Sequence, residues 1–91
     1  MVIWKFNLDV GVNALMVPKG AVTLSADTQQ GKLCVWVLCD PQAPKVTRAY
    51  YAEMTGFEAE RVAGTRFIGT VLLEEGAFVL HVFADEPMPR A

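Results

Sequence analysis

The sequence predicts an all-β, mainly antiparallel fold: a small meander of five or six strands, folded into a sandwich or a partly open barrel. Apolar and more polar residues alternate with a period of two in several segments, which is the pattern of half-buried strands. Short stretches rich in glycine and proline separate these segments and mark turns. Hardly any segment shows helical spacing, so almost no helix is expected.

The first strand is expected at residues 2–8, where apolar side chains recur at every second position. They are Val2, Trp4, Phe6 and Leu8. A turn containing Gly11 follows, and the apolar residues 14–17 are compatible with a short strand. Pro18-Lys19-Gly20 ends that segment and turns the chain.

A hairpin is expected from residues 21–27 and 33–40. In its first strand, Val22, Leu24 and Ala26 would share one face, opposite Thr23, Ser25 and Asp27. The connecting loop contains Gly31, which readily adopts the positive φ of a tight turn. The second strand is apolar on both faces, so it is expected in the middle of a sheet or against a partner subunit.

Residues 45–53 are expected to form a strand at an edge or in another solvated position, because they are rich in polar and charged side chains. Residues 57–63 are compatible with helix but too few for a stable one, so at most one short helical turn, or else an ordered loop, is expected there. Residues 67–73 and 77–84 form the last two strands, joined by a tight turn at residues 74–76. The chain is expected to fray from Asp85, so the single domain is assigned to residues 1–86 and a flexible tail to residues 87–91.

The 91 residues leave no room for a second core. Hydrophobic residues make up 53% of the chain, which excludes a disordered protein. The net charge of −2 argues against a nucleic-acid binder that relies on attraction to phosphates. No apolar run approaches the roughly 20 residues of a membrane-spanning helix. Charged and polar residues also interrupt the N-terminal segment where a secretory signal would need an apolar core, so a cytosolic location is expected.

A domain of this size has difficulty hiding so many apolar residues, and an exposed apolar patch usually marks a partner surface. We therefore expect a homo-oligomer, most simply a dimer. The alternative is a compact β fold that exposes its remaining apolar residues singly. The residues expected at an interface are Trp4, Trp36, Leu38 and Phe83.

The residues offer little support for catalysis or metal binding, so no cofactor and no enzymatic activity are expected. Cys34 and Cys39 lie five apart in one strand, with Cα atoms about 16 Å apart, too far for a disulfide. Buried, inert thiols in a reducing compartment are expected. His81 is expected on the less buried face of its strand, bonded to a neighbouring backbone group or to water; a catalytic pair with either cysteine is the alternative.

A weak signal for anion binding lies between residues 56 and 70. There, glycines and threonines stand close to arginines, whose planar guanidinium groups suit phosphate. The predicted ligand-binding residues are Arg61, Thr65 and Arg66, together with Arg48, which lies beside two tyrosines. The alternative is that these glycines serve turns and, at Gly69, a β-bulge. No motif of a known phosphate-binding loop is present.

Six short motifs, taken in order, resemble an uncharacterised family of small proteins encoded by tailed bacteriophages and prophages. The motifs are Ile3-Trp4-Lys5-Phe6, Pro18-Lys19-Gly20-Ala21, Val35-Trp36 with Asp40-Pro41, Thr55-Gly56, Phe67-Ile68-Gly69-Thr70 and Leu80-His81-Val82-Phe83. The resemblance covers most of the chain. It implies an accessory protein made in the cytoplasm of an infected bacterium, and it carries no catalytic residues over.

Small phage proteins without catalytic motifs frequently act by binding. The resemblance therefore implies a non-enzymatic protein that binds and inhibits a host protein complex, such as a defence complex. An acidic protein can complement a basic, nucleic-acid-handling target. One alternative is an oligomeric small-molecule binder that sequesters a nucleotide-type signal. A further alternative is a component of the virion or of its assembly.

Overall fold

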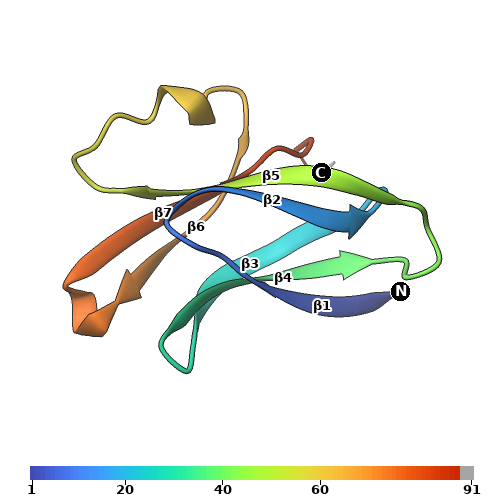
Figure 1. Cartoon of the computed structure of the whole chain (residues 1–91), viewed down its shortest axis with the longest axis horizontal. Coiled ribbons are helices and arrows are strands. Elements are labelled where there is room, and N and C mark those ends of the chain that lie inside the picture. The colour runs from blue at the N-terminus through green and yellow to red at the C-terminus, as the bar shows by residue number, and fades with distance from the viewer. Residues whose placement is uncertain (89–91) are drawn as a thin grey trace.

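Seven strands and two short 3-10 turns make up the computed structural model, which describes residues 1–88 (Figure 1). The strands are β1 (Val2–Asn7), β2 (Gly11–Pro18), β3 (Val22–Gln29), β4 (Lys32–Cys39), β5 (Lys45–Met54), β6 (Arg66–Leu73) and β7 (Phe78–Ala84). The turns are η1 (Glu60–Val62) and η2 (Glu74–Gly76). The all-β class is confirmed, with seven strands in the described residues instead of five or six. The single helical turn expected near residues 57–63 corresponds to η1.

The strands form two antiparallel sheets that pack as a sandwich and do not close into a barrel. One sheet has the order β1-β4-β3, and the other has the order β2-β5-β7-β6. The meander order is therefore wrong: the chain crosses between sheets after β1, after β2 and again after β4. The reason lies in β4, which is apolar on both faces and takes a neighbour on each side, β1 and β3. This leaves β2 to pair with β5.

The β3–β4 hairpin and the central position of β4 are both as expected. Gln30 and Gly31 connect the two strands with φ values of 53° and 76°, the left-handed pair that a two-residue hairpin turn of type I′ requires. On β4, Leu33, Val35, Val37 and Cys39 face the core. Its other face carries Cys34, Trp36 and Leu38.

The expectation that residues 45–53 form an edge strand is wrong. β5 lies between β2 and β7, with Arg48, Tyr50 and Ala52 on the face that points into the sandwich. Polar side chains occur on this inner face because they find polar partners there, described below. The polar composition of residues 45–53 therefore indicated exposure to solvent, whereas in the structure some of these polar side chains belong to a buried cluster.

β3 and β6, which pack against each other across the sandwich, each contain a β-bulge that shifts the pairing register with the neighbouring strand. The register of β3 against β4 shifts between Thr23 and Ser25, so Thr23 is fully buried and Leu24 is 46% exposed. The expected strict alternation of residues 21–27 is therefore wrong. The register of β6 against β7 shifts between Phe67 and Gly69, which confirms the bulge expected at Gly69.

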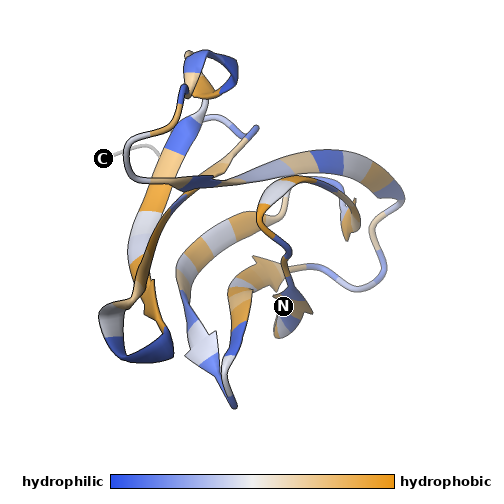
Figure 2. Ribbon diagram, turned by 60° about the vertical axis from the view of Figure 1, so that its left-hand side comes forward, coloured by the Kyte–Doolittle hydropathy of each residue, from blue (hydrophilic) through white to orange (hydrophobic). Residues whose placement is uncertain are grey.

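The core lies between the two sheets and is built from both inner faces. Figure 2 shows apolar positions along the strands of both sheets and hydrophilic positions at the turns. The largest apolar side chains that are fully buried there are Leu80, Val17, Val35, Val37 and Val82. Cys34 and Cys39 are both free and buried, as their spacing predicted.

The first two residues after β7, Asp85 and Glu86, are held against the rest of the domain. The Asp85 amide donates a 2.9 Å hydrogen bond to the Ala49 carbonyl, and Glu86 is buried. The expectation that the chain frays from Asp85 is therefore wrong for these two residues. Pro87 and Met88 are exposed, and residues 89–91 of the predicted tail lie outside the described residues.

Within residues 1–88, no helix has the length and apolar character needed to cross a membrane.

The turn between β3 and β4 yields a test of the fold. Replacing Gly31 by Ala should lower the free energy of unfolding by about 1 kcal/mol, because a Cβ is unfavourable at its left-handed backbone angles. Urea denaturation followed by tryptophan fluorescence measures this change. Gly69→Ala is the matched control: its backbone is not left-handed, and an added Cβ would only touch the Ala26 carbonyl oxygen at 4.0 Å. Equal effects of the two substitutions would contradict the hairpin geometry.

Candidate functional site

Two of the predicted ligand-binding arginines meet inside the protein. Arg48 on β5 and Arg66 at the start of β6 both pair with Glu86. Arg48 Nη1 lies 2.5 Å from Glu86 Oε2 and also donates to the Ala21 carbonyl at 2.6 Å. Arg66 Nη1 pairs with Glu86 Oε1 and donates to the Thr23 carbonyl at 2.8 Å. The Glu86 side chain is only 2% exposed.

Thr23 and Tyr50 complete this buried polar cluster. The Thr23 amide donates to Glu86 Oε1 at 3.0 Å, and the Thr23 hydroxyl lies 3.1 Å from Oε2 and 2.6 Å from the Tyr50 hydroxyl. Burial raises the pKa of Tyr50 above its ordinary value. In the described part of the chain, no buried side-chain nitrogen or oxygen lacks a hydrogen-bond partner. We call Thr23, Arg48, Tyr50, Arg66 and Glu86 the Glu86 cluster.

The Glu86 cluster joins the two sheets, because Thr23 belongs to the three-stranded sheet and both arginines belong to the four-stranded one. Arg48 and Glu86 also line a small pocket of about 300 Å³ beside Pro87 and Met88. The guanidinium groups of Arg48 and Arg66 are thus engaged by a carboxylate of the same chain. Their geometry accounts for a structural role without any ligand.

His81 lies on the outer face of the four-stranded sheet, between two threonines. Its Nδ1 is 2.9 Å from the Thr70 hydroxyl, and its Nε2 is 2.7 Å from the Thr55 hydroxyl. The less buried face was expected, but the hydrogen-bond partners are two threonine hydroxyls and not the backbone group or water that the sequence suggested. Cys34 and Cys39 lie on β4 of the other sheet, so the structure does not bring either cysteine to His81. Burial raises the pKa of the Cys34 thiol.

The outer face of the four-stranded sheet carries a continuous row of apolar and aromatic side chains. Phe67 lies opposite Phe83, Phe83 opposite Tyr51, and Tyr51 opposite Val12, so the row crosses all four strands. The rings of Phe67 and Phe83 are 5.3 Å apart between centroids. Met16 and Leu72, on the outermost strands, are 53% and 60% exposed. We call these six residues the apolar face.

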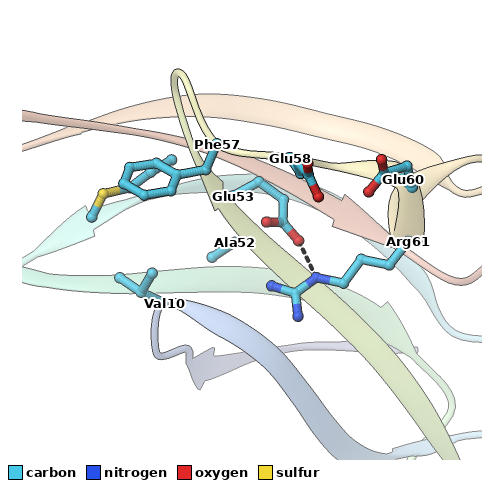
Figure 3. Close-up of a pocket in the computed structure, with 8 residues that line it drawn as sticks. Val10, Ala52, Glu53, Phe57, Glu58, Glu60 and Arg61 are labelled. Atoms are coloured by element: carbon cyan, nitrogen blue, oxygen red, sulfur yellow. Dashed lines mark hydrogen bonds and ion pairs between the residues drawn. The ribbon is translucent and has the colours of Figure 1, made fainter.

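A pocket of about 620 Å³ adjoins the apolar face, where the loop after β5 folds back over the sheet (Figure 3). Arg61 connects the two features: its Nε pairs with Glu53 Oε1, and its guanidinium group lies 5.9 Å from the centre of the Tyr51 ring. Glu53 is 6% exposed. The pocket is lined by Val10, Ala52, Glu53, Met54, Phe57, Glu58, Glu60 and Arg61.

Carboxylates outnumber cationic groups in this pocket. Arg61 compensates Glu53, and the exposed Glu58 and Glu60 have no cationic counterpart among the lining residues. Glu58 and Glu60 are two residues apart in the loop after β5. In the pocket they share the lining with the apolar side chains of Phe57 and of Val10, which reaches the pocket from before β2.

The predicted site residues therefore fall into separate places. Arg61 lines the pocket, whereas Arg48 and Arg66 belong to the Glu86 cluster. Thr65 is half-buried and donates to the Val62 carbonyl at 2.6 Å, where it closes the end of η1. Among residues 1–88, no group of three or more histidine, cysteine, aspartate or glutamate side chains could hold a metal ion.

The four residues expected at an interface do not share one surface. Trp4 packs against the core, with the Lys45 ammonium group 5.4 Å from the centre of its ring. Trp36 and Leu38 are half-buried on the outer face of the three-stranded sheet. Phe83 is half-buried on the outer face of the four-stranded sheet, where it belongs to the apolar face.

The Glu86 cluster predicts a large effect of one small substitution. Glu86→Gln should lower the free energy of unfolding by about 3–5 kcal/mol, because it leaves two guanidinium groups in the interior without their counter-charge. Chemical denaturation measures the change, and Glu58→Gln, at an exposed loop position, is the matched control. A loss no larger than that of the control would show that Glu86 is not docked between the sheets.

Comparison with known proteins places the chain in a family. No curated protein and no solved structure matches it. A family model described as "Domain of unknown function (DUF7352)" matches residues 1–90. That description names no activity, ligand or source. Because the match spans nearly the whole chain, the protein belongs to the DUF7352 family.

Proposed function

We propose that this protein acts by binding another protein through the apolar face of its four-stranded sheet. The observation that carries the proposal is the row from Phe67 through Phe83 and Tyr51 to Val12, which crosses every strand of that sheet. Contiguous apolar patches on soluble proteins mark interaction sites, and aromatic residues are enriched in the centres of interfaces. Tyr51 and Phe83 lie on the two inner strands, so the centre of the surface is held rigidly.

The charges around the apolar face favour a basic partner. Exposed carboxylates stand near it: Glu58 and Glu60 at the pocket, Glu74 and Glu75 at the end of β6, and Asp85 after β7. Complementary charge steers the encounter of two proteins and disfavours wrong partners. The pocket is suited to a lysine or arginine side chain of the partner, with Phe57 along its aliphatic part and Glu58 and Glu60 near its charge.

The resemblance to small bacteriophage and prophage proteins supplies the setting of the proposal. In that setting the partner is a host protein complex in the cytoplasm of an infected bacterium, and the protein inhibits it by occupying its surface. The reaction chemistry of the host complex plays no part, so no cofactor and no catalytic residue are needed. The acidic surroundings of the apolar face fit a target that handles nucleic acid, because such proteins carry basic surfaces.

The proposal is tested by a pair of charge substitutions at matched positions. Phe67 is 53% exposed on the apolar face, and Ile3 is 57% exposed on the outer face of the other sheet. A tagged copy expressed in phage-infected cells is used to capture a host protein, whose affinity for purified variants is then measured. Phe67→Glu should weaken binding by roughly tenfold or more, since it places a charge in a desolvated contact, and Ile3→Glu should not.

The same measurement tests the chemistry of the partner. Binding should weaken as salt is added, because the carboxylates near the apolar face attract a basic surface. The proposal fails if the captured protein binds Phe67→Glu as tightly as the unchanged protein. It also fails if both substitutions weaken binding equally.

A small-molecule binder is the second candidate, and the pocket beside Arg61 favours it. Its volume of about 620 Å³ lies within the range typical of ligand sites, roughly 300–1,000 Å³. Glu58 and Glu60 would repel a nucleotide-type signal there, so a cationic or neutral ligand suits the pocket better. Native mass spectrometry of the untagged protein from infected cells tests the ligand directly: a retained mass of a few hundred daltons supports the small-molecule candidate, and protein without added mass, whether one copy or two, counts against it.

A further inference from the structure

The two sheets cover each other's edges on one side of the sandwich. β3 and β6, each the last strand of its sheet, pack against one another. Arg66 donates from β6 to the Thr23 carbonyl of β3, and Gly69 lies close to the Ala26 carbonyl. Neither of these edges is therefore free to accept another strand. The free edges in the described part of the chain are those of β1 and β2.

β1 and β2 differ in how they protect their free edges. β1 carries Lys5 at its centre, with the ammonium group 2.5 Å from Gln29 Oε1, and a lysine on an edge strand opposes pairing with another chain. β2 has no charged residue over its eight positions, and Pro18 is its last residue. Its outward side chains Val12 and Met16 are both more than half exposed. An uncharged edge of this length is a template for a further strand.

We propose that β2 pairs antiparallel with β2 of a second copy of this chain, so that two four-stranded sheets join into one sheet of eight strands. Opposite residues in a sheet point to the same face, so the pairing must match outward residues with outward residues. Centring the twofold axis at Ala14 does so and uses residues 12–16, which leaves the fully buried Val17 and Pro18 outside the ladder. Ala14 then lies opposite Ala14 of the partner subunit, and Val12 lies opposite Met16 of the partner subunit.

This register is self-complementary. A small alanine lies at the axis, where the two strands are related by symmetry, and a valine–methionine pair lies on each side of it. No charge opposes another charge in the ladder. The apolar row of one copy, which ends at Val12, continues directly into Met16 of the partner subunit. The dimer therefore doubles the apolar face, but its formation does not depend on the proposed host partner.

Cysteine cross-linking tests both the dimer and its register. Ala14→Cys should form a disulfide-linked dimer under mild oxidation, since the two Cα atoms would lie about 5 Å apart. Val12→Cys should not link to itself, because the two copies of residue 12 would be about 13 Å apart. The double variant with Val12→Cys and Met16→Cys should link. Leu72→Cys is the matched control, because Leu72 is also exposed but lies on β6, the other outermost strand of the same sheet. The two native thiols are buried.

Light scattering on the full chain gives the second readout. The unchanged protein should be a dimer, and Ala14→Lys should be a monomer, because two lysines would face each other at the axis. Leu72→Lys should remain a dimer. A monomer at millimolar concentration would overturn the proposal, as would a dimer in which Ala14→Cys links no faster than Leu72→Cys. The Phe67→Glu and Ile3→Glu variants change neither β2 nor its register, so the outcome for the host partner is read separately.

Discussion

The carboxylate of Glu86 ties the two sheets together. It accepts a hydrogen bond from the Thr23 amide on one sheet and pairs with Arg48 and Arg66 on the other. Removing three charges from water carries a desolvation cost that can equal or exceed the attraction among them, so the cluster is not counted as a source of net stability. Here it holds β3 against β6 and closes that side of the sandwich. The opposite side, with β1 and β2, is left as the place where another chain can join.

This arrangement also explains why the surfaces suited to binding lie where they do. The polar side chains of β5 point inward to the Glu86 cluster, and its Tyr51 points outward into the apolar face. The four-stranded sheet is thus partly polar inside, and its outer face carries the apolar row from Phe67 to Val12 beside a polar row of Thr70, His81 and Glu53. Arg48 and Arg66 are engaged within the protein, and Arg61 is held against Glu53. An apolar contact surface near exposed carboxylates is therefore better supported than an anion-binding site.

Local sequence patterns predicted much of the fold, but they could not predict which strands far apart in the chain pair with each other. Period-two alternation located most strands, Gly31 marked the hairpin, and the doubly apolar β4 was expected at the centre of a sheet. Alternation shows which residues of a strand share a face, but it does not show which other strand is the neighbour. The β1–β4 and β2–β5 pairings therefore had no local signal. Glu86 lies 38 residues from Arg48 and 20 from Arg66, in a segment where the chain was expected to fray. The pocket was equally hidden, because Val10 and Glu58 meet only in the folded chain.

Hydrogen exchange at the Thr23 amide tests most directly whether Glu86 holds the sheets together. This amide donates to the Glu86 carboxylate. If the carboxylate is docked as described, the amide exchanges only when the whole domain unfolds, so its protection should equal that of the slowest amides in β4 and β7. Protection as low as that of the exposed loop at Gly64 would contradict the account. It would mean that the segment after β7 detaches readily and that something else joins the two sheets.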